Sequence, residues 1–97
     1  MEHNASEVPF SFSWRSYPLN PSATVSFTLE DAQEVTLRIF DLYGRLLHTI
    51  FESVPLRPGF HEIHLFGDTV PVGGCYARLH TRRGVQQRTL LRMTDTL

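Results

Sequence analysis

The chain has 97 residues, of which 41% are hydrophobic and 20% are charged. These values are typical of one ordinary globular domain and exclude a disordered chain, which would be poorer in hydrophobic residues. The formal net charge of −1 lacks the basic excess of a nucleic-acid-binding domain. No stretch approaches the roughly 20 apolar residues that a transmembrane helix needs. A single cysteine, Cys75, excludes an intramolecular disulfide.

Short runs that alternate apolar and polar residues, separated by Gly, Pro, Asn and Asp, predict β-strands along the chain. The first alternation covers residues 10–14 and is followed by a turn-rich segment, residues 16–22. We interpret residues 1–16 as a linker or an added edge strand, and residues 17–97 as the domain proper. Further strands are expected at residues 24–29, 34–41, 45–51, 60–66, 76–81 and 85–93. Turns and loops are expected at residues 42–44, 55–59, 67–74 and 82–84.

The number and spacing of these runs indicate the fold class. Six or seven short strands, at intervals of roughly 8–12 residues, favour an antiparallel sandwich or barrel over a fold of alternating strands and helices. We expect an all-β, immunoglobulin-like antiparallel β-sandwich of about seven strands. Each strand should have one core face and one solvent face. The expected core positions are Val25, Phe27, Leu29, Val35, Leu37, Ile39, Leu47, Ile63, Leu65, Ala77 and Leu79.

Histidines raise the question of a metal site. The segment His61-Glu62-Ile63-His64 is one residue shorter than the H-E-x-x-H motif of zinc proteases, and it lies in a strand pattern. Residues 61 and 64 of a strand point to opposite faces, whereas zinc needs three or four convergent ligands. We therefore expect no metal site, and we interpret these histidines as solvated or hydrogen-bonded strand residues.

No arrangement of residues fills the roles of a catalytic site. The sequence contains neither a G-x-S-x-G nucleophile elbow nor a glycine-rich phosphate loop. A catalytic cysteine needs a base and an orienting partner, but Cys75 follows two glycines where a loop enters a strand. We interpret Cys75 as a small, inert, partly buried side chain. The chain is expected not to be an enzyme and to need no cofactor.

Arginines are concentrated near the C-terminus. They are Arg78, Arg82, Arg83, Arg88 and Arg92. Arg78, Arg82 and Arg88 could form one basic face of the last hairpin, with Gln86 and Gln87 near them. Such a face would suit an acidic partner or an anionic glycolipid. The alternative is a solvated hairpin whose charges discourage aggregation through the sheet edge.

Several segments, taken in order, resemble a known family. They are Tyr-Pro-Leu-Asn-Pro-Ser at 17–22, Thr-Val-Ser-Phe-Thr-Leu at 24–29, the segment 35–45 that ends in Leu-Tyr-Gly-Arg, Pro-Gly-Phe-His-Glu-Ile at 58–63, Gly-Cys-Tyr-Ala-Arg-Leu at 74–79, and the strand 87–93. In this order and spacing, residues 17–97 resemble the C-terminal sorting domain (type A) of proteins exported by the type IX secretion system.

The resemblance implies a function as well as a fold. Such a domain is a seven-stranded, immunoglobulin-like sandwich without catalytic activity, and it serves as an address tag at the end of a larger exported protein. A passenger domain would precede this chain. The outer-membrane translocon would recognise the tag after it reaches the periplasm, and a cell-surface sortase of the cysteine-peptidase type would remove it. The cargo would end at the cell surface, often joined to anionic lipopolysaccharide, or in the medium.

The family's motif residues can be placed on this chain. The turn glycine and arginine correspond to Gly44 and Arg45, the loop glycine to Gly59, and the Gly-x-Tyr element to Gly74 and Tyr76. The glycines suit backbone turns that a side chain would obstruct. Tyr76 is expected to pack its ring and to hydrogen-bond its hydroxyl group.

The recognition surface implied by the family lies near the last strand, from Arg88 through Arg92 to Met93. This chain departs from the family pattern in two places. Leu19 is inserted into the usual Tyr-Pro-Asn-Pro motif, and Arg92 stands in a last segment that usually contains lysine.

Two other functions remain open on sequence. One is a structural module such as the immunoglobulin-like domain of a flagellar hook-assembly scaffold. That family usually carries a Trp-Asp-Gly stretch where this chain has Leu-Phe-Gly-Asp at 65–68. The other is an adhesive or carbohydrate-binding sandwich, which needs an exposed aromatic platform. The candidates for such a platform are Phe40, Tyr43 and Phe51.

Overall fold

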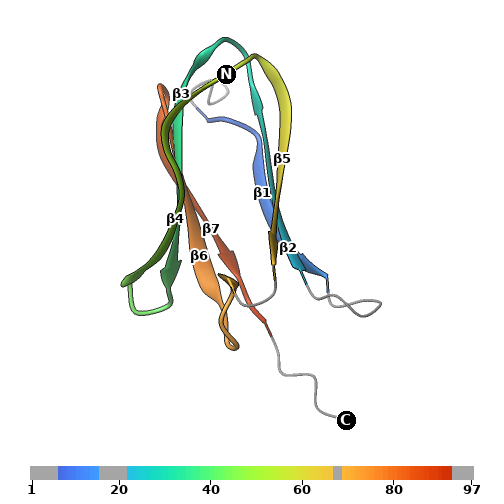
Figure 1. The fold of residues 1–97 in the computed structure, drawn as a ribbon, viewed down its shortest axis with the longest axis vertical. Coiled ribbons are helices and arrows are strands. Elements are labelled where there is room, and N and C mark those ends of the chain that lie inside the picture. The colour runs from blue at the N-terminus through green and yellow to red at the C-terminus, as the bar shows by residue number, and fades with distance from the viewer. Residues whose placement is uncertain (1–6, 16–21, 67–68, 93–97) are drawn as a thin grey trace, which may run out of the picture.

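The computed structural model describes residues 7–15, 22–66 and 69–92 (Figure 1). Their strands form two antiparallel sheets packed face to face, so the expected immunoglobulin-like β-sandwich is confirmed. The strands are β1 (Phe10–Arg15), β2 (Ser22–Leu29), β3 (Gln33–Asp41), β4 (Leu46–Leu56), β5 (Gly59–Phe66), β6 (Cys75–Thr81) and β7 (Gly84–Leu90). The turn-rich segment at 16–21, residues 67–68 of the expected loop, and Met93 lie outside the described residues.

The strand order brings distant parts of the chain together. One sheet has the order β1-β2-β5 and the other the order β4-β3-β6-β7. The chain therefore passes between sheets after β2, β4 and β5, whereas β3–β4 and β6–β7 are hairpins within a sheet. This Greek-key connection places β2 and β5, and likewise β3 and β6, side by side. As a result, β7 forms one edge of the four-stranded sheet.

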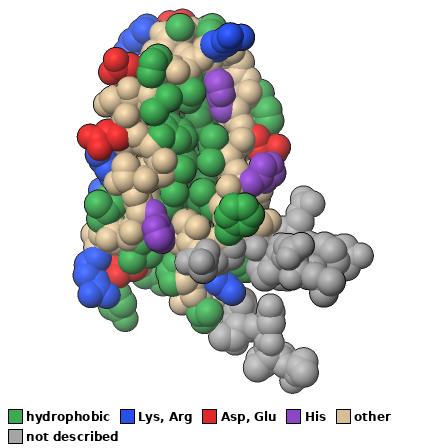
Figure 2. Space-filling model, viewed as in Figure 1, with side chains coloured by type: hydrophobic (Ala, Val, Ile, Leu, Met, Phe, Trp, Pro, Cys, Tyr) green, Lys and Arg blue, Asp and Glu red, His purple; other side chains and the backbone are tan. Residues whose placement is uncertain are grey.

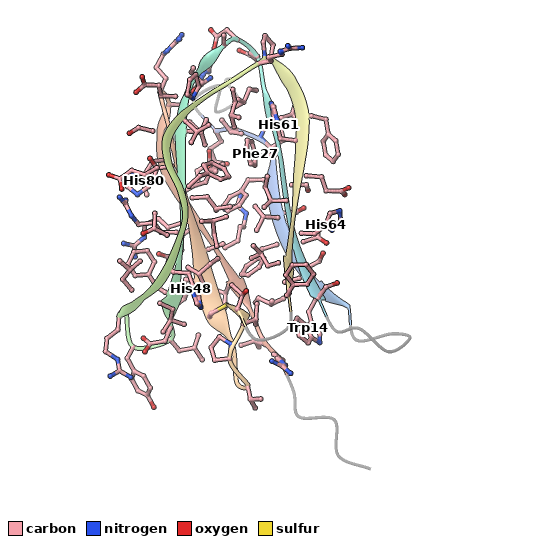
Figure 3. The ribbon with its side chains drawn as sticks, viewed as in Figure 1. Trp14, Phe27, His48, His61, His64 and His80 are labelled. Carbon is pink, nitrogen blue, oxygen red and sulfur yellow. The ribbon has the colours of Figure 1, made fainter. Side chains whose placement is uncertain are left out.

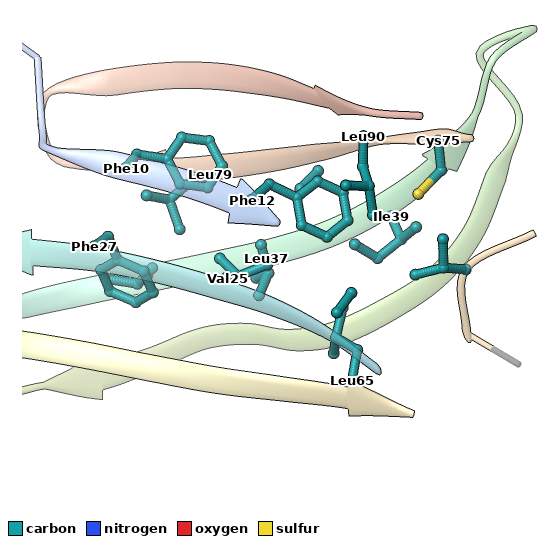
Figure 4. Close-up of a cluster of buried hydrophobic side chains, with 14 of the residues drawn as sticks. Phe10, Phe12, Val25, Phe27, Leu37, Ile39, Leu65, Cys75, Leu79 and Leu90 are labelled. Atoms are coloured by element: carbon teal, nitrogen blue, oxygen red, sulfur yellow. The ribbon is translucent and has the colours of Figure 1, made fainter. Parts of the chain in front are cut away.

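The core lies between the two sheets and follows the predicted alternation (Figure 4). In β2 every second residue is buried, including Val25, Phe27 and Leu29. All but two of the expected core residues are buried. Burying a large apolar side chain contributes roughly 1.5–3 kcal/mol, so this alternating register fixes which face of each strand turns inward.

The two exceptions, Leu47 and Ile63, lie on edge strands of opposite sheets. Leu47 on β4 is 38% exposed, and Ile63 on β5 is only partly buried. Strands β4 and β5 end different sheets on the same side of the sandwich, where hydrophobic side chains reach the surface (Figure 2). No strand of the described chain pairs with the outer edge of β4 or of β5. Side chains on these two strands are therefore less completely covered than those on the central strands.

Strand β4 is longer and less regular than expected. It runs to Leu56 and contains Pro55, so the expected turn at 55–59 is confined to Arg57 and Pro58. An edge strand tolerates Pro55 because one side of its backbone needs no partner. Three register shifts against β3 each add a residue to β4, and such bulges change the face to which side chains point. This explains why an alternation rule failed for Leu47.

The N-terminal residues belong to the sandwich. Strand β1 pairs with β2 along its whole length, and Phe10 and Phe12 are buried in the core. Val8, just before β1, is buried too. Of the two alternatives for residues 1–16, the described part is therefore an edge strand. Phe10 and Phe12 were not among the expected core positions, although their alternation with serine is visible in the sequence.

Candidate recognition surface around the C-terminal strand

Strand β7 is held against the N-terminal strand by its own side chains. Gln86 accepts a hydrogen bond from the Val8 backbone N–H at 2.7 Å and donates one to the Val8 carbonyl at 2.8 Å. Arg88 donates from Nε to the Phe10 carbonyl at 3.0 Å, and its guanidinium lies 5.0 Å from the centre of the Phe10 ring. These contacts join the two sheets through side chains where no backbone ladder connects them.

Arg78 lies on the other face of the same hairpin. It is paired in register with Gln87 on the outer face and donates to the Gln87 side-chain oxygen from Nε at 3.0 Å and from Nη2 at 2.8 Å. Its guanidinium also covers the Phe40 ring at 4.1 Å. Arg88 points between the sheets and Arg78 points to solvent. These arginines therefore do not form the single basic face that was one of the two alternatives from the sequence.

The arginines at the tip of the hairpin bind acidic residues. Arg82 Nη1 lies 3.1 Å from Asp31 Oδ2, and Arg83 Nη2 lies 2.6 Å from Glu30 Oε1. These pairs connect the β6–β7 turn to the β2–β3 turn at one pole of the sandwich. The two acidic residues therefore neutralise the positive charge at the tip of the hairpin. This is a further reason why no basic face forms. Exposed pairs of this kind contribute roughly 0–1 kcal/mol each.

Arg92, which follows the end of β7, contacts two other segments of the chain, the end of β1 and the loop between β5 and β6. It donates from Nη1 to the Val70 carbonyl at 2.6 Å, and its guanidinium lies 4.4 Å from the centre of the Trp14 ring. The Gly73 backbone N–H donates to the Arg92 carbonyl at 2.8 Å. We call Trp14, Val70, Gly73, Gly74 and Arg92 the C-terminal clasp. Trp14 comes from β1, so the first and last strands meet at this pole as well (Figure 3).

Gly74 brings the clasp into direct contact with β7. Its φ is +130°, and a Cβ atom at this position would collide with the Leu90 carbonyl oxygen. This is a site where only glycine fits the space and the backbone conformation. Tyr76 follows on the outer face of β6, in register with Phe40 on β3 and Thr89 on β7. The Gly-x-Tyr element thus sets the position of the last two strands.

Gly44 and Arg45 form the β3–β4 turn with Asp41. Gly44 has a φ of +92°, and its N–H donates to the Asp41 carbonyl at 3.0 Å. The Asp41 carboxylate accepts from the Arg45 backbone N–H, from Arg45 Nε and from the Tyr43 N–H, each at 2.9 Å. These hydrogen bonds, that from the Arg45 N–H above all, hold the pKa of Asp41 below its ordinary value. Gly59, with a φ of +116°, begins β5.

The histidines of β5 point to opposite faces, as predicted (Figure 3). His61 turns inward and stacks on Phe27, with ring centres 5.3 Å apart, and donates from Nε2 to the Arg57 carbonyl at 2.7 Å. His64 turns outward, where Nδ1 lies 3.2 Å from Thr24 Oγ1. Among the residues that the structure describes, no three histidine, cysteine or acidic side chains converge as metal ligands.

Cys75 is fully buried instead of partly buried. Its thiol lies in the core at the start of β6, and burial raises the pKa of Cys75 to about 11. The neutral thiol therefore predominates near pH 7, and a thiolate nucleophile is disfavoured.

The aromatic residues considered for an adhesive platform do not share a surface. The Arg78 guanidinium covers Phe40, and Phe51 packs against the core. Tyr43 is 87% exposed at the tip of the β3–β4 turn. These three residues therefore form no common platform.

Comparisons with models of protein families, with curated proteins and with solved structures found no match to this chain. Within the described ranges, no helix is long and apolar enough to cross a membrane. The candidate surface is therefore defined by this chain alone. It consists of the edge strand β7, the exposed Leu91 and the C-terminal clasp.

Proposed function

We propose that this domain is a C-terminal secretion signal that directs a preceding passenger protein through a type IX outer-membrane translocon. A cell-surface sortase then removes the domain. The observation that carries the proposal is the ordered series of family motifs from residue 17 to residue 93. The passenger would pass through the periplasm and end at the cell surface or in the medium.

The positions of the motif residues support this proposal. Gly44 and Arg45 form the turn between β3 and β4, Gly59 begins β5 after the turn that follows β4, and Gly74 allows the clasp to approach β7. The motif residues thus contribute to a rigid frame that presents the last strand at a sheet edge. An edge strand is suited to pair with a strand of a partner protein.

The start of the described chain and the end of β7 lie far apart, which suits a domain that carries a passenger at one end and is recognised at the other. The described chain begins next to β1 at one pole, whereas β7 ends at the opposite pole (Figure 1). Leu91, directly after β7, is 65% exposed. We assign Leu91 to translocon recognition, because it is an exposed apolar residue within the expected recognition segment. A passenger joined before β1 would lie away from Leu91.

A reporter assay tests the proposal. A periplasm-targeted fluorescent reporter is fused in front of the full chain and expressed in a bacterium that has the type IX system. We expect protease-accessible reporter at the surface, periplasmic reporter in a translocon-deficient strain, and an uncleaved fusion in a sortase-deficient strain. Periplasmic retention in the intact strain would contradict the proposal, and co-purification with hook proteins would favour the structural-module alternative.

A matched pair of variants locates the recognition surface. Leu91→Asp is expected to reduce surface delivery, because it places a charge in the exposed apolar contact beyond β7. Val85→Asp is the control, because Val85 is also an exposed apolar residue of this region but lies at the other end of β7. Equal delivery by both variants would exclude Leu91 as a recognition residue.

A further inference from the structure

The outer face of the three-stranded sheet carries two rows of hydroxyl groups. They belong to Ser11 and Ser13 on β1 and to Ser22, Thr24, Ser26 and Thr28 on β2. The rows are in register, since Ser11 lies opposite Ser26 and Ser13 opposite Thr24. The Ser11 and Ser26 hydroxyls are hydrogen-bonded at 2.7 Å. Each hydroxyl group can both donate and accept a hydrogen bond, so the array can bind ligands rich in hydroxyl groups.

Strand β5 adds aromatic and charged side chains to the same face. Phe60, Glu62, His64 and Phe66 alternate with its inward residues, and each lies opposite one residue of the β2 row. Phe60 is 64% exposed and Phe66 is 80% exposed. Phe66 is six residue steps along the strand from Phe60, which corresponds to about 20 Å. Two phenylalanine rings thus mark the two ends of a polar strip.

The surface between these rings is hollowed. A hollow of about 330 Å³ is lined by Ser13, Ser22, Thr24, Ser26, Glu62 and His64. A second hollow, of about 190 Å³, lies beside Phe60 and shares Ser26 with the first. The two hollows therefore follow one another along β2. We call this surface, from Phe66 to Phe60, the hydroxyl groove.

The side chains in the groove are linked to one another. His64 is hydrogen-bonded to Thr24 at 3.2 Å, and its Nε2 lies 3.5 Å from Glu62 Oε1. These contacts orient the imidazole ring and hold the carboxylate at the side of the hollow. All three residues are solvent-accessible, so they lack the water-excluded setting in which a hydroxyl–imidazole–carboxylate chain becomes a strong nucleophile. The arrangement is suited to binding.

We propose that the hydroxyl groove binds an uncharged polysaccharide. The C–H faces of sugar rings would stack on Phe60 and Phe66, and sugar hydroxyls would bond to the serine and threonine rows and to the Glu62 carboxylate. Sites of this kind combine apolar surfaces with a few oriented polar groups. The Glu62 carboxylate lines the larger hollow. Its negative charge repels the phosphates of nucleic acids and the acidic groups of anionic glycans, whereas it can accept hydrogen bonds from the hydroxyl groups of a neutral sugar.

The two exposed phenylalanines are not residues that a merely solvated sheet face favours. Exposed apolar rings are unfavourable in water, and on an edge strand such as β5 they promote aggregation. The opposite face of the same strand holds its apolar residues in the core. A function on the outer face explains why large rings lie at both ends of the hydroxyl rows.

Native affinity electrophoresis of the full chain tests the inference. The protein is run in gels that contain a soluble mixed-linkage glucan, a galactomannan, a xylan or, as the charged comparison, alginate. We expect retardation by at least one uncharged polysaccharide and none by alginate. Phe66→Ala and Glu62→Ala should each weaken binding about tenfold. Tyr43→Ala is the matched control, because it removes an exposed ring outside the groove.

The assay separates the possible outcomes. Phe66 is mostly exposed, so its replacement should leave the fold intact, and an unchanged melting temperature verifies this. Thr24→Arg is a second variant, which fills the larger hollow and introduces a charge. Retardation by no uncharged polysaccharide, retardation by alginate alone, or wild-type binding by Phe66→Ala and Thr24→Arg would each overturn the inference. The secretion assay uses none of these variants, so the two proposals fail independently.

Discussion

Gly74 has no side chain at the point where the loop before β6 touches the end of β7. The contact is with the Leu90 carbonyl, and it sets the distance between the clasp and the last strand. The neighbouring Gly73 also has a positive φ, of +98°, but open space surrounds the position of its missing Cβ. Backbone strain from a side chain is expected at both positions, whereas a steric collision is expected only at Gly74. Comparing the two therefore distinguishes these two effects.

Replacing the two glycines by alanine should therefore have different effects. Gly74→Ala should lower the free energy of unfolding by about 3 kcal/mol, because strain and collision act together. Gly73→Ala, the control, should lower it by about 1 kcal/mol through strain alone. Urea unfolding, with the slope of the transition held constant, measures both values. Equal losses would show that the collision is relieved by movement of the loop.

Asp41 predicts a pH dependence of stability. Its folded-state pKa lies below the ordinary value of 3.8 because it accepts hydrogen bonds, first from the Arg45 N–H. A carboxylate with a lowered pKa stabilises the fold above its unfolded-state pKa, and this contribution is lost as the pH falls through the folded-state pKa. Unfolding followed between about pH 5 and about pH 2 should show this loss, and Asp41→Asn should make the curve flatter. Identical slopes for both proteins would contradict this account.

At the scale of single elements, β7 is attached differently on its two faces. On the inner face, Arg88 binds the Phe10 carbonyl and covers the Phe10 ring, and this contact connects the two sheets. On the outer face, Arg78 covers Phe40 within one sheet and is open to solvent. The same residue type on the same kind of ring therefore has two different structural roles.

This difference gives a matched mutational test. Arg88→Ala should lower the free energy of unfolding by about 2 kcal/mol, because a part-buried carbonyl loses its partner. Arg78→Ala should lower it by at most about 0.5 kcal/mol, since its contacts are exposed. Chemical denaturation of both variants checks the ranking. A larger loss for Arg78 would show that the outer face of the hairpin contributes more than the contact between the sheets.

Sequence patterns predicted the regular strands. They failed where contacts between distant parts of the chain determine which way a side chain points and what it binds. Alternation in β2 and β6 identified Phe27 and Leu79 as core residues, because burial on one face imposes that period. It failed in β4, since a bulge shifts the period without a clear mark in the sequence. The partners of Arg88 and Arg92 come from β1 and the β5–β6 loop, more than twenty residues away, and no local pattern specifies such pairs. The motif glycines were predictable because turns are local.

At the scale of the whole molecule, β1 closes the core. A domain boundary at residue 17 would remove Phe10, Phe12 and Trp14, of which the first two are buried and Trp14 packs against the core. Loss of a buried phenylalanine side chain costs about 3–5 kcal/mol, and a whole domain has only about 5–15 kcal/mol of stability. The segment chosen for any experiment on this domain must therefore include β1.

Truncation checks this requirement. A chain of residues 17–97 should be unfolded or aggregated, as judged by circular dichroism and gel filtration. A chain of residues 7–97 is the control and should be folded and elute like the full chain, because it retains all the described contacts. A folded, cooperative 17–97 fragment would show that the other six strands form a sufficient core.

The contacts between the first and last strands also determine how the domain responds to tension. Val8 and Phe10 bind Gln86 and Arg88 in the same order, so β1 and β7 run parallel. The described chain enters β1 at one pole and leaves β7 at the other (Figure 1). A force that pulls the two ends apart therefore loads β1 in shear against both β2 and β7, and many hydrogen bonds must break together. Peeling, in which bonds break one at a time, would need a different direction of pull. The domain is consequently built to resist mechanical unfolding along the line that joins its own ends.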